Sequence, residues 1–485
     1  MSLGHRALAL GVILGTVVVV AYAVGSAAGG DARTSVSSAP VRETPPRVLA
    51  PPRLRRDPRP DILLFTVDTL RADHLSAYGY ARDTSPTMAS LARRGTRFDR
   101  AHSTSSWTVP AVTSLVTGVI PSQHGVFHGQ PSADGVVEQE RISTTMPTLA
   151  SVLGAAGYRT IGVTTNGHLA PEFGFDRGFD SYQNLGFGEA DDLRAALDPQ
   201  LEELRRSDRP FFLWVHVIDP HVPYAPNEPQ FTEWWPSSRP RYPTLDRMTF
   251  APTMPLIVRH DHLPPVEALE YVVTAYDSEI RHVDTYLEHL LAELDDGNLA
   301  VVLTSDHGEE FQDHHGMGHG STLFEEQVRV PLIVAVPEQA PSVSSALVSI
   351  IDVLPTLAEI TGTAVPSGPT GRSLMPAVRG ETLPSARELT FESGRSQVLR
   401  GITDGHYKYG ARIEPSPIEG LFDLESDPLE QHPCQSEHPD IALAMRDRMN
   451  AILDEASTRR PPIETVRVDL PPEIRAQLEA LGYGN

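Results

Sequence analysis

The sequence of 485 residues contains a single cysteine, Cys434. No intrachain disulfide can therefore form, and a zinc site built from several cysteines is excluded. Basic residues are also scarce, because 40 Lys and Arg face 63 Asp and Glu and leave a formal net charge of −23. Since binding to a phosphate backbone needs a concentrated basic surface, nucleic acid is excluded as a partner. A small anionic substrate is not excluded, because a metal ion and a few histidines can invert the local field.

Charged side chains are absent from residues 7–30, which follow His5 and Arg6 and include a strongly apolar run at 12–20. A short basic start, an apolar run and small residues are typical of a secretory signal. The run is also long enough to span a bilayer, so an uncleaved membrane anchor is the alternative. In both cases the basic start places the rest of the chain outside the cytoplasm, and we expect an exported periplasmic or extracellular protein. Residues 31–59, rich in Pro and Arg, are typical of an extended linker.

Apolar runs that end in polar residues recur between helical patterns from residue 60 onward. Strands that are apolar on both sides belong in a sheet covered on both faces. The predicted strands are 62–67, 160–164, 211–217, 299–304 and 330–336, and the predicted helices are 85–94, 110–117, 146–156 and 266–294. This alternation predicts an α/β fold with a large, mostly parallel sheet flanked by helices.

The pattern changes near Pro384. Short β-like segments precede a polar stretch and two helical patterns; they lie at 388–391, 397–403 and 406–409, and the helices at 442–456 and 473–481. We therefore predict a catalytic domain over residues 60–383 and a smaller C-terminal α+β subdomain over residues 384–485.

Acidic residues follow two of the predicted strands. Asp68 ends the first strand, and Asp306 and His307 follow a later one in the sequence TSDHGEE at 304–310. Open α/β sheets bind ligands at the carboxyl ends of their strands, and an Asp with a His can direct an oxygen and an imidazole at one ion. The alternative is structural, with the Asp as a helix cap and the His as a buried packing residue.

Thr108 stands in the sequence WTVPAVTSLVTG at 107–118. Pro110 suits the first turn of a helix, so Thr108 lies at or just before the helix N-terminus. The free amides and the dipole at that end would stabilise an alkoxide or an anionic group. In the alternative interpretation Thr108 is only the capping residue.

Two histidine-containing segments complete the polar residues of interest. The sequence HVIDPHVPY at 216–224 ends a predicted strand, and its His216 and His221 could act as general acids or hold an anionic oxygen. The loop HHGMGHG at 314–320 contains His319 between glycines, which favour close approach to a ligand. A packed structural histidine and a solvated loop are the corresponding alternatives.

Six motifs in this order resemble the sulfatase family within the alkaline phosphatase superfamily, over roughly residues 60 to 430. They are PDILLFTVDTLR (60–71), SLVTGVIPSQHG (114–125), DPHVPY (219–224), TSDHGE (304–309), GRSLMP (371–376) and LFDLESDP (421–428). The resemblance implies an alkaline phosphatase-like fold and hydrolysis of a sulfated or phosphorylated small molecule, glycan or lipid. It also implies roles for eight residues: Asp68, Asp306 and His307 as metal ligands, Thr108, His221 and His319 as catalytic residues, and His128 and His216 as substrate-binding residues.

The sequence departs from the family at the nucleophile. The family signature is Cys-x-Pro-Ser-Arg, whose Cys is oxidised to formylglycine, and this chain has Thr108, Pro110, Ala111 and Val112 there. A secondary hydroxyl would not yield an aldehyde, so no formylglycine is expected. A threonine nucleophile with one metal resembles the phosphoglycerol transferases and some phosphodiester hydrolases.

The expected metal ligands also differ from those of the sulfatase family. The family's paired Asp is here Asp68-Thr69, and His307 replaces the Asn often found beside the second Asp. Imidazole shifts preference from calcium toward manganese or zinc, so the expected cofactor is one divalent ion, manganese, zinc or calcium. Relatives often have an Asn a few residues beyond His124-Gly125, where this chain has His128.

Two other functions stay open at this point. One is a transferase that moves a phosphoglycerol or phosphoethanolamine group onto an envelope glycan or lipid. The other is a catalytically silent sulfatase fold that serves as a binding module, which the altered nucleophile signature would suit. A sulfated Thr108 lacks the hemiacetal route of formylglycine enzymes, whereas a phosphorylated Thr108 can be released by metal-assisted displacement. This difference favours phosphate esters, while the overall resemblance favours sulfate esters.

Overall fold

The protein is described by a computed structural model over residues 57–131, 136–188, 190–242, 266–365, 368, 370–384, 386–394, 398–414 and 418–469. The described residues form one compact unit. The predicted signal or anchor, most of the predicted linker and the predicted helix at 473–481 lie outside the described residues. No helix within the described ranges is long and apolar enough to cross a membrane.

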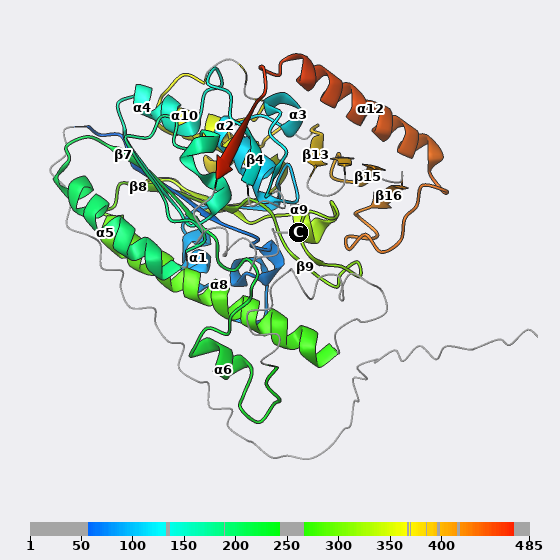
Figure 1. Ribbon diagram of the computed structural model, residues 1–485, viewed down its shortest axis with the longest axis horizontal. Coiled ribbons are helices and arrows are strands. Elements are labelled where there is room, and N and C mark those ends of the chain that lie inside the picture. Colours follow the sequence, from blue (N-terminus) through cyan, green and yellow to red (C-terminus); the bar gives the residue numbers. More distant parts are fainter. Residues whose placement is uncertain are drawn as a thin grey trace, which may run out of the picture. The chain divides into compact units, whose positions relative to one another are not determined.

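A sheet of eight strands forms the centre of the larger region (Figure 1). Its order is β12 (Ser342–Ser349), β2 (Thr96–His102), β11 (Leu332–Ala335), β8 (Leu299–Ser305), β1 (Asp61–Val67), β7 (Phe211–Val217), β5 (Arg159–Thr164) and β6 (Ser181–Asn184). Among these strands β11 runs antiparallel to both neighbours, and the other pairs are parallel. The predicted α/β fold with a large, mostly parallel sheet is confirmed.

Helices cover both faces of this sheet (Figure 1). Side chains alternate along β1, so Leu63 and Phe65 enter one core and Ile62 and Leu64 enter the other. The first core is completed by α1 (Pro86–Ala92), α5 (Ala190–Arg206) and α8 (Val266–Leu294), and the second by α2 (Thr108–Thr117), α4 (Leu149–Ala155) and α10 (Val353–Ile360). Burial on both faces explains why the central strands have continuous apolar sequences.

A smaller antiparallel sheet follows in the chain. It consists of β13 (Leu389–Ser393), β14 (Val398–Thr403), β15 (Tyr407–Glu414) and β16 (Ile418–Asp423). The helix α12 (Pro439–Thr458) packs on one face of it through Met449 and Leu453. The predicted C-terminal α+β region is therefore confirmed as architecture. Because β17 (Glu464–Asp469) pairs with β4 (Val136–Arg141) of the larger region, the predicted domain boundary at residue 384 stays a prediction.

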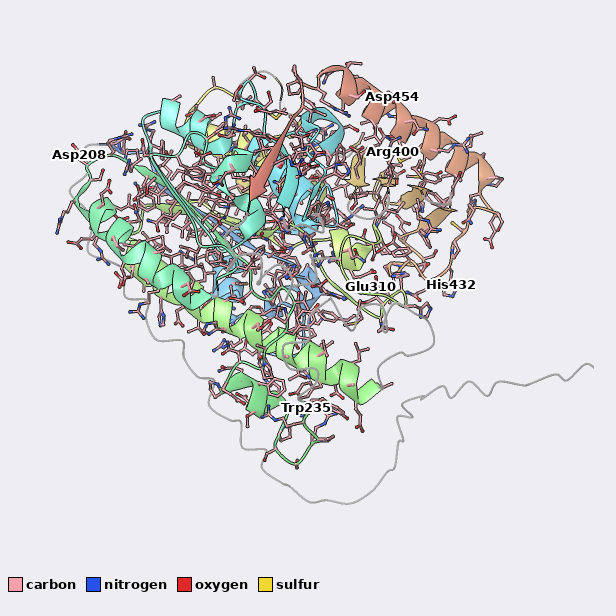
Figure 2. The ribbon with its side chains drawn as sticks, viewed as in Figure 1. Asp208, Trp235, Glu310, Arg400, His432 and Asp454 are labelled. Atoms are coloured by element: carbon pink, nitrogen blue, oxygen red, sulfur yellow. The ribbon has the colours of Figure 1, made fainter. Side chains whose placement is uncertain are left out.

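Short elements complete the described residues. They are α3 (Pro121–His124), α6 (Gln230–Trp234), α9 (Glu325–Val328), α11 (Met375–Val378), β3 (Gly129–Pro131), β9 (Glu310–Phe311) and β10 (Met317–Gly318). Trp235 directly follows α6 (Figure 2), and its ring and that of Phe231 in α6 pack edge-on against Tyr271 of α8, with centroid distances of 5.2 and 5.1 Å. This aromatic cluster anchors α8, which contributes a side chain to the site described below.

His314 links the larger region to the C-terminal sheet region. Its Nδ1 lies 2.9 Å from a carboxylate oxygen of Glu326, and its Nε2 lies 3.1 Å from the backbone oxygen of Glu430. Both partners accept hydrogens, so the ring must carry two protons to satisfy them. Burial disfavours the charged ring, but the bonds to Glu326 and Glu430 outweigh it and raise the pKa of His314 to about 9.

The protonated His314 is therefore expected to stabilise the fold in a defined pH window. Its contribution is complete below the ordinary pKa of about 6.5 and is lost as pH rises to about 9, because the folded state holds the proton more tightly. Melting temperatures measured from pH 6 to 9.5 should fall more steeply for the wild type than for His314→Asn. If the melting temperatures of the two proteins fell in parallel with pH, His314 would not be the group that stabilises the fold below pH 9.

Candidate active site

Three neighbouring parallel strands place the predicted metal-binding residues at one edge of the large sheet. In the register, Val67 of β1 lies opposite Ser305 of β8 and Val217 of β7. Asp68 and Asp306 are the next residues after β1 and β8, so their carboxylates emerge side by side. This is the edge at which open α/β sheets bind ligands.

The side chains at this edge form a compact buried cluster. His307 Nε2 lies 3.6 Å from Asp68 Oδ1 and 3.5 Å from Asp306 Oδ2. His216 Nε2 lies 3.5 Å from Asp68 Oδ2. Thr108 Oγ1 lies 3.3 Å from His307 Nε2 and 3.5 Å from Asp68 Oδ2. None of the five side chains is more than 1% exposed, so the residues predicted from distant segments of the sequence meet in one place.

The two histidines present lone pairs to the cluster. His307 Nδ1 lies 2.9 Å from the carbonyl oxygen of Gly308, which can only accept a hydrogen, so Nε2 is left unprotonated in the neutral ring. His216 Nδ1 lies 2.9 Å from Thr66 Oγ1, whose own hydrogen is directed to the carbonyl of Val215 at 3.2 Å. The Nδ1 of His216 is therefore the donor, and its Nε2 also presents a lone pair.

These donor atoms fit a divalent cation. Three of them, Asp68 Oδ1, Asp306 Oδ2 and His216 Nε2, are buried and have no hydrogen-bond partner among the described residues. One ligand atom each from Asp68, His216 and Asp306 lies within 4.8 Å of the others. Ligands around a tetrahedral ion at about 2.1 Å are about 3.4 Å from one another, close to the separations of 3.5 and 3.6 Å found here.

The two carboxylates perturb each other. Burial and the charge of Asp68 raise the pKa of Asp306 to about 6. Burial acts in the same direction on Asp68, but the nearby His216, His221 and His307 outweigh it and lower its pKa. Two buried carboxylates this close repel each other unless a proton or a cation lies between them.

Thr108 is the first residue of α2. Trp107 before it is extended and its side chain makes no capping bond, and Pro110 lies in the first turn. The first amides of a helix lack internal acceptors and carry the positive end of its dipole. Thr108 Oγ1 is therefore placed between the helix N-terminus and the carboxylate cluster, as the sequence predicted.

A second group of histidines lies beside the cluster. The ring of His319 lies 4.5 Å from the ring of His307 and 4.8 Å from that of His221, measured between centroids. His221 Nδ1 lies 2.6 Å from the carbonyl oxygen of Val222, so that nitrogen carries a proton. His319 Nδ1 lies 2.9 Å from Glu309 Oε1, and both side chains are fully buried. Glu309 thus fixes the tautomer and orientation of His319.

Removing the charge of Glu309 is expected to impair catalysis through His319. Glu309→Gln loses the charge-assisted bond to Nδ1, and kcat should fall about 10–100-fold with little change in KM. Glu309→Asp should recover part of the loss, because it keeps the charge. Steady-state kinetics with melting temperatures test this, and an unchanged kcat in a folded Glu309→Gln variant would show that His319 needs no such orientation.

The two predicted substrate-binding residues are placed differently. His216 lies inside the carboxylate cluster and is fully buried, a position that suits a ligand to the cation. The side chain of His128 is 58% exposed and bonds to Glu140 at 2.5 Å. Its described contacts are with Glu140 and Phe127 rather than with the cluster, so its role in substrate binding stays a prediction.

Several supporting residues were not assigned a role from the sequence. Asn166 follows β5 and donates from Nδ2 to Asp68 Oδ2 at 2.7 Å. Thr69 has a left-handed backbone (φ 54°), and its carbonyl accepts a bond of 2.7 Å from Tyr276 of α8. A β-branched residue in that conformation is strained. Asn166 could have been found, because it follows a predicted strand, whereas the contact with Tyr276 depends on the packing of α8.

Solved structures share this fold. A phosphonate monoester hydrolase of Agrobacterium radiobacter superposes with a TM-score of 0.67 at 21% identity, covering 82% of this chain and 96% of that one. A sulfatase-like protein of Bacteroides thetaiotaomicron superposes with a TM-score of 0.65 at 20% identity, covering 86% and 96%. The predicted alkaline phosphatase-like architecture is confirmed.

Characterised relatives are similar in sequence over most of their length. A choline-sulfatase of Rhizobium meliloti is 28% identical over 447 residues, which cover 77% of this chain and 81% of the relative. Arylsulfatase A of Bos taurus is 28% identical over 434 residues, covering 77% and 83%.

The family models match the chain in two parts. The model described as N-sulphoglucosamine sulphohydrolase, C-terminal, matches residues 313–455, and the sulfatase model matches residues 60–363, more than half of the chain. The predicted family and the predicted class of ester hydrolase are confirmed. The chain belongs to the sulfatase family.

Proposed function

We propose that the protein hydrolyses sulfate or phosphorus esters with Thr108 as nucleophile and one divalent cation as cofactor. The single observation that supports this most strongly is the position of Thr108 Oγ1, 3.3 Å from His307 Nε2 and 3.5 Å from Asp68 Oδ2. A threonine that only capped the helix would not need its hydroxyl next to buried Asp and His side chains, which are residue types that bind metals. The cation would be held by Asp68, Asp306 and His307, with His216 as a fourth protein ligand.

The charge of the site favours esters with one negative charge. The charged groups that act on Asp68 and Asp306 are histidines and each other. Two carboxylates balance one divalent cation, and neutral histidines add no charge, so little positive potential is left for a dianion. Sulfate monoesters, phosphodiesters and phosphonate monoesters are monoanions, and phosphate monoesters are dianions near neutral pH. Choline sulfate esters and phosphonate monoesters, after which one sequence relative and one structural neighbour are named, carry the ester group of this monoanionic set.

The chain's own residues supply the remaining steps. The cation, when bound, would lower the pKa of the Thr108 hydroxyl and withdraw charge from the ester. Thr108, after its hydroxyl has released a proton to solvent, bonds through Oγ1 to sulfur or phosphorus as the bond to the alcohol oxygen breaks, and it is an alkoxide again after the group has been displaced. His221 or His319, in its doubly protonated form, donates the proton of Nε2 to that leaving oxygen. Water displaces the group from Thr108, and its proton returns to the same histidine.

We also propose where the enzyme acts and which metal ion it uses. Export follows from the apolar N-terminal residues 7–30, with either a cleaved signal or a membrane anchor. Manganese or zinc suits a site with two imidazoles better than calcium, which prefers oxygen ligands. A sulfated glycan, lipid or small molecule would be met outside the cytoplasm.

A panel of esters tests the proposed function. Sulfate monoesters, phosphate monoesters, phosphodiesters and phosphonate monoesters of one alcohol should be compared on the metal-loaded protein. We expect turnover of at least one monoanionic class and slower turnover of phosphate monoesters. Transfer to glycerol or a glycan in place of water would favour the transferase, and metal binding without turnover of any class would favour a silent binding module.

A further inference from the structure

Three glycines lie in one row across the C-terminal sheet. Gly410 of β15 pairs with Gly401 of β14 on one side and with Gly420 of β16 on the other. Residues paired in this way point to the same face of a sheet. The row therefore leaves a strip of bare backbone across three strands, about 10 Å long at the usual strand spacing.

Neither packing nor backbone conformation requires a glycine at Gly410. A Cβ at Gly401 would lie 3.3 Å from Leu323 Cδ1, and a Cβ at Gly420 would lie 2.9 Å from the ring of Phe422, so both positions are crowded. A Cβ at Gly410 would meet nothing within 4 Å, and its φ is not in the left-handed region. Glycine within a strand weakens it and often marks close approach of a ligand.

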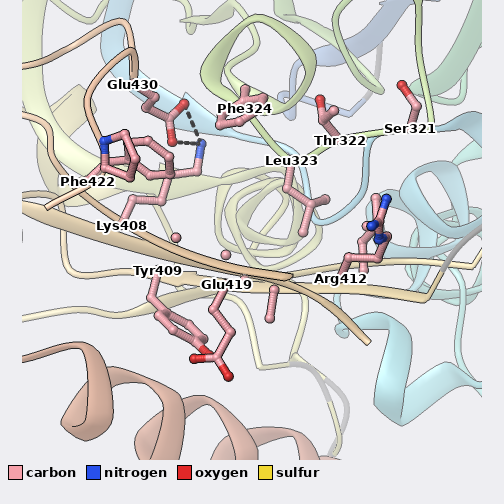
Figure 3. Close-up of a pocket in the computed structure, with 16 residues that line it drawn as sticks. Ser321, Thr322, Leu323, Phe324, Lys408, Tyr409, Arg412, Glu419, Phe422 and Glu430 are labelled. Atoms are coloured by element: carbon pink, nitrogen blue, oxygen red, sulfur yellow. Dashed lines mark hydrogen bonds and ion pairs between the residues drawn. The ribbon is translucent and has the colours of Figure 1, made fainter. Parts of the chain in front are cut away.

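A cavity of about 380 Å³ lies along this strip. Figure 3 shows Leu323, Phe324 and Phe422 on one side of the sheet together with Lys408 and Arg412, while Tyr409 and Glu419 point to the other side. The walls are thus mainly an aliphatic and two aromatic side chains above a glycine floor.

The charged group at one end of the cavity is neutralised. Lys408, the only lysine of the chain, is buried, and its Nζ lies 2.9 Å from Glu325 Oε1 and 3.1 Å from Glu430 Oε1. An ammonium held between two carboxylates offers little net attraction to an anionic ligand. The Lys408 end of the cavity therefore suits an apolar group, whereas Arg412 lines another part of it.

The loop that forms the cavity wall also carries His319. Ser321 lines the cavity and is two residues from His319, so their Cα atoms are at most about 7 Å apart. Two hydrogen bonds from the side chain of Gln327 hold the loop in place. Its Oε1 accepts from Gly320 N at 3.0 Å, and its Nε2 donates to Thr322 Oγ1 at 2.7 Å. One short loop segment therefore carries both His319 and part of the cavity wall.

We propose that the cavity above Gly401, Gly410 and Gly420 binds the apolar part of the substrate's alcohol, so that esters of longer alkyl alcohols are preferred over esters of short ones. This inference rests on the proposed function, since it assigns the leaving group of the same reaction. The glycine row provides the space, and Leu323, Phe324 and Phe422 provide the apolar contacts.

Filling the cavity from its floor is the direct test. Gly410→Leu places a side chain in the space where a Cβ meets no neighbour, so its melting temperature should equal or exceed that of the wild type. Gly410→Ala is the matched control, because it makes the same backbone change while leaving most of the volume. Two measurements are needed. The first is hydrolysis of n-alkyl esters from butyl to decyl, made with whichever monoanionic ester class the enzyme hydrolyses fastest. The second is calorimetric binding of 1-octanol, which needs no turnover.

For the wild type we expect kcat/KM to rise by up to about fourfold per methylene group placed in the cavity. Gly410→Leu should flatten this dependence on chain length and abolish octanol binding, and Gly410→Ala should lie between it and the wild type. Equal octanol binding by wild type and Gly410→Leu, or none by either, would overturn the proposal. If octanol binding is lost in Gly410→Leu but no ester is hydrolysed, the cavity assignment stands and the proposed function fails.

Discussion

Thr108→Ala is expected to lower ester hydrolysis by about 10³-fold or more, since loss of a covalent nucleophile removes the main reaction route. The fold and the cation site should persist, because the substitution removes only the hydroxyl and one methyl group from a side chain beside the ligands. Thr108→Ser keeps a hydroxyl at the same place and should retain much of the activity. Rates, melting temperatures and bound metal should be measured on the same preparations.

Thr113→Ala provides the matched control for Thr108. Thr113 is another buried threonine of α2, and its hydroxyl donates to the backbone oxygen of Val109 at 2.8 Å, one turn earlier in the helix. Its loss should cost some stability but little activity per folded molecule. Full activity of Thr108→Ala, or equal losses in the two variants, would remove Thr108 from the mechanism.

Removal of the cation is expected to abolish activity and destabilise the fold together. Asp68 and Asp306 repel each other when no cation lies between them, and burial together with the charge of Asp68 raises the pKa of Asp306 to about 6. A ligand present at a thousandfold excess over its Kd stabilises a folded protein by about 4 kcal/mol. A chelator should therefore lower both the melting temperature and kcat of the wild type, and the divalent ion should restore both.

Asp306→Asn separates this effect from nonspecific chelation. The variant loses one ligand charge and the repulsion from Asp68, so its melting temperature should no longer respond to chelator, and its activity should be very low throughout. Asp73→Asn is the control, because Asp73 is half-exposed and bound to Arg71 instead. A chelator response in Asp306→Asn equal to that of the wild type would place the cation elsewhere.

The residues of the buried cluster were predictable because the ends of parallel strands converge at one edge of the sheet. Asp68, Asp306 and His307 follow continuous apolar strands, and Thr108 precedes a proline that fixes a helix start. The structure brings seven of the eight predicted side chains together and leaves His128 on the surface. Helix α8 also has the predicted bounds, because its long apolar stripe has no competing signal.

Strands whose sequences mix apolar residues with charged residues or serines could not be predicted in the same way. Strand β2 has the sequence TRFDRAH, whose charged residues are only partly buried, and β12 is rich in serine at the edge of the sheet. These strands are stabilised by pairing rather than by their own pattern. The contacts of Asn166, Glu309 and Tyr276 depend on how separate segments pack, and no local spacing encodes that.

The most direct measurement is capture of a covalent group on Thr108. Rapid acid quench of the metal-loaded enzyme during turnover, followed by peptide mass spectrometry, should find one sulfo or phospho group on Thr108. The Thr108→Ala variant should show none. Turnover at a normal rate with the peptide unmodified at every quench time, or modified at another residue, would contradict the account.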